Sequence, residues 1–127
     1  MSRQEALFQS LATSGAVLMT FVGVCHFVVG AKLFPWAPDL LGPIVWYGLG
    51  IVAITMGFLL LLGTLRIIRF PVFSMALLGA AVGLVVGLFT AAAYQEFHLF
   101  AFTVVLAATG TAVFHRKASR LAALTEG

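Results

Sequence analysis

The chain has 127 residues, of which 62% are hydrophobic and 9% charged, and its mean hydropathy is +1.14. A soluble domain carries about 45–50% apolar and about 25% charged residues, so this composition excludes an ordinary soluble protein. A helix that crosses a bilayer needs about 20 apolar residues, which leaves room for at most about four or five such helices and for no soluble domain. The seven basic and four acidic residues leave little material for a polar catalytic centre or a solvated ion pathway.

Four apolar runs predict four transmembrane helices, separated by a proline-rich segment at 35–38, a basic turn at 66–69 and a polar turn at 94–98. The first three runs make helices of about 35 Å, enough to cross a hydrocarbon core of about 30 Å, and the shorter fourth recruits flanking residues. These runs lack the alternation of apolar and polar residues that the strands of a β-barrel require. The sequence therefore predicts an all-α, single-domain, four-helix transmembrane bundle. The expected spans are residues 11–34, 41–65, 71–93 and 99–115.

The basic residues predict the orientation, because cytoplasmic loops of membrane proteins carry an excess of Lys and Arg. With the N-terminus inside, the outer side holds only Lys32, so both termini are expected to be cytoplasmic. We interpret Arg66 and Arg69 as residues that fix this topology. The functional alternative is that they bind anionic lipids. The basic residues on the cytoplasmic side account for the pI of about 9.6. We therefore expect no nucleic acid as a partner. The expected inner basic residues are Arg3, Arg66, Arg69, Arg116, Lys117 and Arg120.

Small residues recur at every fourth position of the third span, at Gly79, Gly83, Gly87 and Ala91. In a membrane, such a stripe lets another helix approach closely. The stripe predicts either a dedicated oligomer interface or a groove for a neighbouring helix of the same chain. The second interpretation is the more ordinary one, because four short helices must pack somewhere.

Polar residues are expected to converge in the outer half of the bundle. His26 is expected about 12 Å below the outer end of its helix, and Tyr47 and Thr90 at a comparable depth. Tyr94 and His98 are expected above them, at the outer interface. These five residues predict a small cavity that opens outward, where His26 binds a quinone head group or another small polar molecule. The plainer alternative is that a neighbouring hydroxyl or carbonyl satisfies a neutral His26, which then only fixes helix register.

A haem held between His26 and His98 is a further possibility, because two imidazoles that face each other across a slot can ligate its iron. Their expected depths differ by much of half a helix, which argues against it.

The sequence lacks the residues that several common kinds of catalysis and transport require. No Asp or Glu lies inside an expected span, so carboxylate-based proton coupling has no titrating group. Metal-ligand clusters, phosphate loops and hydrolase elbows are missing, and Cys25 has no second cysteine to pair with. We therefore expect no metal site and a protein that is not an enzyme.

Residues 19–70 resemble the first half of the DoxX and DoxX-like family of small four-helix membrane proteins. The stretches that carry the resemblance are Gly23–Phe27, Phe34–Pro38, Gly50–Gly57 and Gly63–Arg66. The resemblance implies a bacterial-type inner (plasma) membrane and, for some members, a link to quinone-linked sulfur oxidation or redox homeostasis. The acidic residue that many relatives carry in the second span would fall near Ala53, which is apolar. Only His26 carries over as a possible site residue.

The function expected from the sequence is that of an accessory or assembly subunit which packs through its third span and holds a quinone- or lipid-sized ligand near His26. The alternative is a quinone- or haem-binding redox subunit, or an oligomeric small-molecule transporter or channel. The expected partners are membrane lipids and either further copies of the chain or other membrane subunits.

Overall fold

The structure, a computed structural model, describes residues 2–28, 43–95 and 98–126. Within these ranges the chain is all-helical and each of its four helices is long and apolar enough to cross a membrane. The end of the first expected span, residues 29–34 with Lys32, and the segment Phe34–Pro38 lie outside the described residues. The helices are α1 (Arg3–Val28), α4 (Pro43–Thr64), α5 (Val72–Tyr94) and α6 (Leu99–Glu126).

Two helices reach beyond the apolar runs seen in the sequence. α1 begins at Arg3 rather than at residue 11, because the backbone N–H of Glu5 donates to Ser2 Oγ at 3.1 Å. Ser2 and Glu5 occupy the two positions of a capping box, a common helix start. α6 continues to Glu126 rather than ending near residue 115, since Arg and Lys are good helix formers and nothing in the basic segment breaks the helix.

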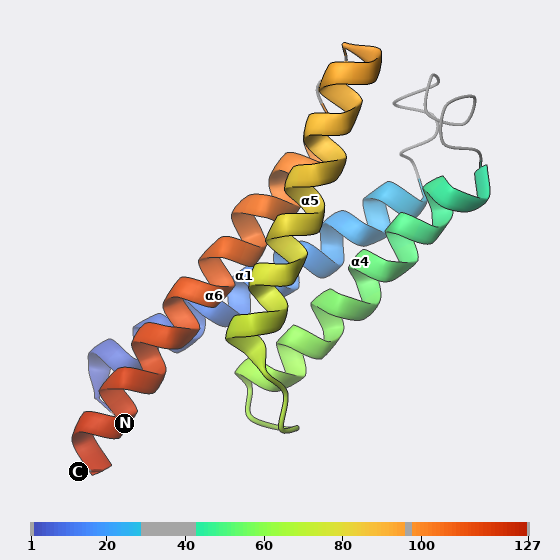
Figure 1. Cartoon of the computed structure of the whole chain (residues 1–127). Coiled ribbons are helices and arrows are strands. Elements are labelled where there is room, and N and C mark those ends of the chain that lie inside the picture. The colour runs from blue at the N-terminus through green and yellow to red at the C-terminus, as the bar shows by residue number, and fades with distance from the viewer. Residues whose placement is uncertain (1, 29–42, 96–97, 127) are drawn as a thin grey trace.

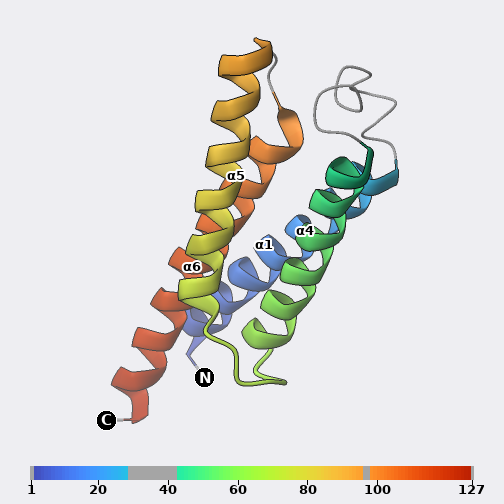
Figure 2. The same cartoon turned by 45° about the vertical axis from the view of Figure 1, so that its right-hand side comes forward.

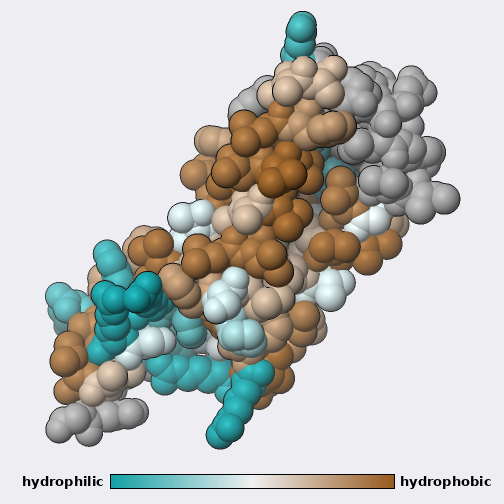
Figure 3. Space-filling view, viewed as in Figure 1, coloured by the Kyte–Doolittle hydropathy of each residue, from teal (hydrophilic) through white to brown (hydrophobic). Residues whose placement is uncertain are grey.

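The four helices form a bundle with one open side. α1 lies along both α4 and α6, and α5 lies along α6, whereas α4 and α5 share few contacts. Both views show α4 and α5 diverging from the turn that joins them (Figures 1 and 2). This turn lies at the end of the bundle that also holds the two termini, and hydrophilic side chains gather mainly there (Figure 3).

Glycines bring α1 into near-backbone contact with its neighbours. A Cβ atom added at Gly57 of α4 would stand 2.7 Å from the backbone N of Thr20, and one at Gly23 would stand 2.7 Å from the backbone N of Ile54. α6 approaches α1 in the same way, since a Cβ atom added at Gly15 would stand 2.9 Å from the backbone oxygen of Ala107. Helices in lipid gain little from the hydrophobic effect, so such close approach supplies much of their packing energy.

The small-residue stripe of α5 faces the same chain. A Cβ atom added at Gly83 would stand 3.0 Å from Val105 Cγ2 of α6, and the added Cβ atoms at Gly79 and Gly87 would also meet side chains of α1 or α6. Ala91, the last member of the stripe, is exposed. The contacts of the three glycines therefore belong to packing within the chain and give no support to an oligomer interface on this stripe.

The turn after α4 has a defined hydrogen-bond pattern. The N–H of Arg66 donates to Gly63 O at 3.1 Å, and that of Ile67 donates to Leu62 O at 3.0 Å. This pair of bonds is the Schellman motif, whose left-handed residue is usually glycine. Arg66 occupies that position with φ at 61°. A left-handed conformation at a residue with a Cβ atom costs about 1–2 kcal/mol, so the other interactions of the turn must offset it.

Replacing Gly57 with alanine should destabilise the bundle, because the new methyl group must push α1 and α4 apart. We expect Gly57→Ala to lower the free energy of unfolding by about 1–3 kcal/mol. Unfolding of the detergent-solubilised protein, followed by circular dichroism, measures the change.

Gly48→Ala is the matched control on the same helix, since a Cβ atom there meets no atom of the described residues within 4 Å. We expect it to leave stability unchanged or to raise it by about 0.5–1 kcal/mol, because alanine is the better helix former. Equal losses in the two variants would contradict the close approach of α1 and α4.

Candidate ligand site between the helices

All four helices line a cavity of about 200 Å³. Its walls are almost wholly apolar, with side chains such as Met19, Met56 and Val104. Val52 of α4 and Val82 of α5 line it and are exposed, so the cavity opens on the side of the bundle where α4 and α5 diverge. The sequence predicts an opening toward the outer face. The mouth instead faces sideways, between two helices.

His26 is the one titratable side chain among the described residues that line this cavity. It comes from α1 and is 6% exposed. Its ring stacks on that of His98, with centroids 5.4 Å apart and planes 11° from parallel. The edge of Phe100 completes the group, 5.7 Å from the His26 ring. Two imidazoles thus lie together at the wall of an otherwise apolar cavity.

His98 also holds the start of α6. It precedes the first helical residue, is 3% exposed, and its Nδ1 accepts a hydrogen bond of 3.1 Å from the backbone N–H of Ala101. An imidazole nitrogen that accepts carries no proton, so this cap requires the neutral ring with its proton on Nε2. Burial acts in the same direction and lowers the pKa of His98. The ring that contacts His26 is therefore fixed in position and in protonation state.

The other predicted ligand residues lie apart from this pair. Tyr47 is exposed and packs against Phe27 in an edge-to-face contact, with centroids 5.4 Å apart. Thr90 is fully buried, and its hydroxyl donates to carbonyl oxygens of its own helix. Tyr94 is the last residue of α5, and its side chain lies outside the described part of the chain. Of the five predicted residues, the structure brings His26 and His98 together.

The expectation that His26 and His98 differ greatly in depth is wrong, since their rings are in contact. The depth was counted along each helix separately, and that count ignores how the helices are tilted and offset. The pair still does not suit a haem, because axial ligands approach the iron from opposite faces of a macrocycle. These rings are stacked on each other, and a cavity of about 200 Å³ is below the usual range of about 300–1,000 Å³ even for drug-sized ligands.

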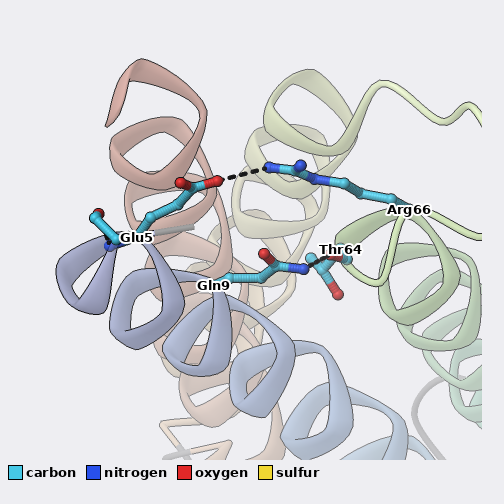
Figure 4. Close-up of polar contacts among 5 residues, drawn as sticks. Glu5, Gln9, Thr64 and Arg66 are labelled. Atoms are coloured by element: carbon cyan, nitrogen blue, oxygen red, sulfur yellow. Dashed lines mark hydrogen bonds and ion pairs between the residues drawn. The ribbon is translucent and has the colours of Figure 1, made fainter. Parts of the chain in front are cut away.

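A buried carboxylate lies at the opposite end of α1, before the first span expected from the sequence. Glu5 is 4% exposed and its Oε1 lies 3.6 Å from Arg66 Nη2 (Figure 4). Next to this pair, Gln9 Nε2 donates to the backbone oxygen of Thr64 at 3.1 Å. Glu5 precedes the first span expected from the sequence, residues 11–34, and the structure makes it part of α1, which begins at Arg3. The capping-box spacing of Ser2 and Glu5 was the signal that could have shown it.

The predicted basic anchors gather at this same end. The Arg116 guanidinium lies 4.8 Å from the centre of the Phe73 ring, and Lys117 Nζ lies 5.4 Å from that of Phe8. Arg69 and Arg120 are exposed. Stacking on aromatic rings holds two of these cations beside the helices while their charge stays near the surface.

No family model, curated protein or solved structure matches the chain. The assignment of the site rests on the geometry of the chain's own residues, and the DoxX-like resemblance stays a prediction.

Lowering the pH should destabilise the protein through His98, whose pKa lies below the ordinary value of 6.5. Between the two values the unfolded chain binds a proton that the folded chain excludes, so the free energy of unfolding falls as the pH falls and levels off below the folded pKa. His98→Asn keeps a capping oxygen but has no titrating group. We expect it to make the dependence of the melting temperature on pH between about pH 7 and 5 shallower by the contribution of His98, because His26 and His115 remain in the variant.

His98→Ala is the companion variant, because it removes both the titrating group and the cap. We expect it to be about 1 kcal/mol less stable than His98→Asn at every pH in that range, because the two variants differ in the cap alone. If the melting temperature of His98→Asn depended on pH as steeply as that of the unchanged protein, His98 would not take up a proton on unfolding.

Proposed function

We propose that the chain is a non-enzymatic, multi-pass protein of a bacterial-type inner (plasma) membrane, with both termini cytoplasmic, that binds a lipid-soluble molecule with a compact polar head. The cavity between α4 and α5, with His26 at its wall, is the observation that carries the proposal. A quinone is the ligand class that suits it best, because only the compact ring has to enter the cavity of about 200 Å³ while the tail lies between the helices.

The shape and chemistry of the cavity support this ligand class. Its walls offer apolar contact nearly everywhere, and binding sites of this type use a few polar groups to orient the ligand. An imidazole can both donate and accept hydrogen bonds, so His26 suits a carbonyl or a hydroxyl of a ring. A strongly charged ligand would lose its hydration without an opposite charge in the cavity, which excludes such ligands.

The sideways mouth supports entry from the bilayer. Exposed apolar side chains flank it on both helices, among them Val52, Leu78 and Val82. A ligand dissolved in lipid can enter between α4 and α5 without crossing water, and a long apolar tail can stay in the bilayer while the head is bound. The same features suit an accessory subunit that holds its ligand for a partner protein.

Binding of a short-tailed quinone analogue to the protein in nanodiscs tests the proposal. We expect His26→Ala to weaken binding about tenfold, because one hydrogen bond to the head group is lost. Ala53→Phe, which fills the cavity, should abolish binding. Quenching of intrinsic fluorescence by the quinone measures both.

His115→Ala is the control, since His115 lies near the opposite end of the molecule, beside Arg116 in α6. It should bind as the unchanged protein does. Undiminished binding by both His26→Ala and Ala53→Phe in folded protein would remove the cavity as the ligand site.

Single cysteines test the orientation. In a Cys25→Ser background we would introduce Gln95→Cys, after α5, or Ser119→Cys, near the other end; both positions are exposed. A charged maleimide that cannot cross membranes should label Gln95→Cys in intact bacterial spheroplasts, and Ser119→Cys only after permeabilisation. The reverse pattern would show inverted insertion, and labelling of both without permeabilisation would contradict the membrane-spanning arrangement.

A further inference from the structure

The turn between α4 and α5 forms an open hollow that carries two arginines. Its lining runs from Gly63 through Arg66 and Arg69 to Pro71. Arg66 reaches toward Glu5, yet its side chain remains 50% exposed (Figure 4). Arg69, three residues later in the same turn, is exposed as well. The hollow is therefore lined by two arginines from one short segment.

Positive charge exceeds negative charge at this place. Among the described residues, Glu5 is the carboxylate paired with Arg66. Arg116 adds a third guanidinium close by, because it lies over the ring of Phe73 in the first turn of α5. One carboxylate against three guanidiniums leaves a surplus of positive charge beside the hollow. Guanidinium groups bind phosphate oxygens through two parallel hydrogen bonds, so phosphate is the anion that suits them.

Apolar side chains alternate with the arginines in the same turn. Ile67 is 65% exposed, and Leu65 and Ile68 are exposed as well. A free phosphate ion makes no use of such side chains. A phospholipid does, because its phosphate and its acyl chains lie next to each other at the membrane surface.

We propose that this turn binds the head-group phosphate of an anionic phospholipid, with Arg69 and Arg66 on the phosphate and the acyl chains along Ile67 and Ile68. The proposal rests on the membrane placement proposed above and is independent of a ligand at His26. On the face seen in Figure 3, the hydrophilic side chains of the described residues gather mainly at the end of the bundle that carries this turn, as expected at a membrane surface. Each Arg near an anionic leaflet contributes about 1 kcal/mol to attraction.

Binding of phosphatidylglycerol to the full chain in a neutral detergent tests the proposal, with native mass spectrometry as the readout. We expect phosphatidylglycerol to bind more tightly than phosphatidylcholine. Arg69→Gln should weaken phosphatidylglycerol binding about fivefold, the effect of one Arg contact. Arg69 serves as the test because a change at Arg66 would also break the ion pair with Glu5.

Arg120→Gln is the matched control, because it removes the same charge from an exposed position of α6 outside the hollow. It should leave phosphatidylglycerol binding unchanged. Equal weakening by the two variants would overturn the proposal in favour of diffuse attraction. Inorganic phosphate, judged by the rise in melting temperature, should stabilise the protein far less than phosphatidylglycerol does. Equal stabilisation would identify a phosphate-ion site instead of a lipid site.

Ile67→Ser separates the acyl-chain contact from the phosphate contact. It should weaken binding of long-chain phosphatidylglycerol and leave that of a soluble glycerophosphate unchanged. Equal binding of the long-chain lipid by Ile67→Ser and the unchanged protein would remove the acyl chains from the site. Because the cysteine labelling reports insertion separately, failure here would leave the proposed orientation and the His26 ligand standing.

Discussion

The close approach of α1 to its two neighbours is the contact on which the rest of the bundle depends. Gly57 and Gly23 bring α4 against α1, and Gly15 brings α6 against the same helix. In the proposed membrane setting, van der Waals packing between these backbones replaces the hydrophobic driving force that lipid does not supply. α5 then packs along α6, and its glycines are used in that contact. With α1 at the centre, α4 and α5 meet only near their turn, and the open side of the bundle follows.

This arrangement separates two polar groups along one helix. Near one end of α1, His26 stacks on His98 beside the apolar cavity. At the other end, Glu5 pairs with Arg66, whose left-handed turn conformation places its side chain there. Each group joins α1 to the first or last residues of another helix, so buried polar contacts fix the register of elements that are otherwise held by small apolar side chains. The two proposed sites, for a ligand head and for a lipid phosphate, are adjacent to these two groups.

Four apolar runs in the sequence were sufficient to predict an all-helical chain with four long helices, because backbone groups in lipid must bond within the segment. The starts and ends of α1 and α6 were not predictable from hydropathy, since charged residues at helix ends do not interrupt a helix. The contact between His26 and His98 also escaped the sequence, because depth along one helix says nothing about its offset from another. The stripe of Gly79, Gly83 and Gly87 left two interpretations open in the sequence, and the contacts of these glycines with α1 and α6 favour packing within the chain.

The sideways opening between α4 and α5 determines whether the concentration in lipid or the concentration in water governs the proposed binding of a ligand near His26. In the proposed membrane arrangement, a molecule that enters sideways equilibrates with the lipid, so its occupancy of the cavity depends on its mole fraction in the membrane and hardly on its amount in water. A sparingly soluble compound can then fill the cavity even when the contacts with His26 are individually weak. Occupancy would also follow the packing of the surrounding lipid, because neighbouring acyl chains compete for the same apolar opening.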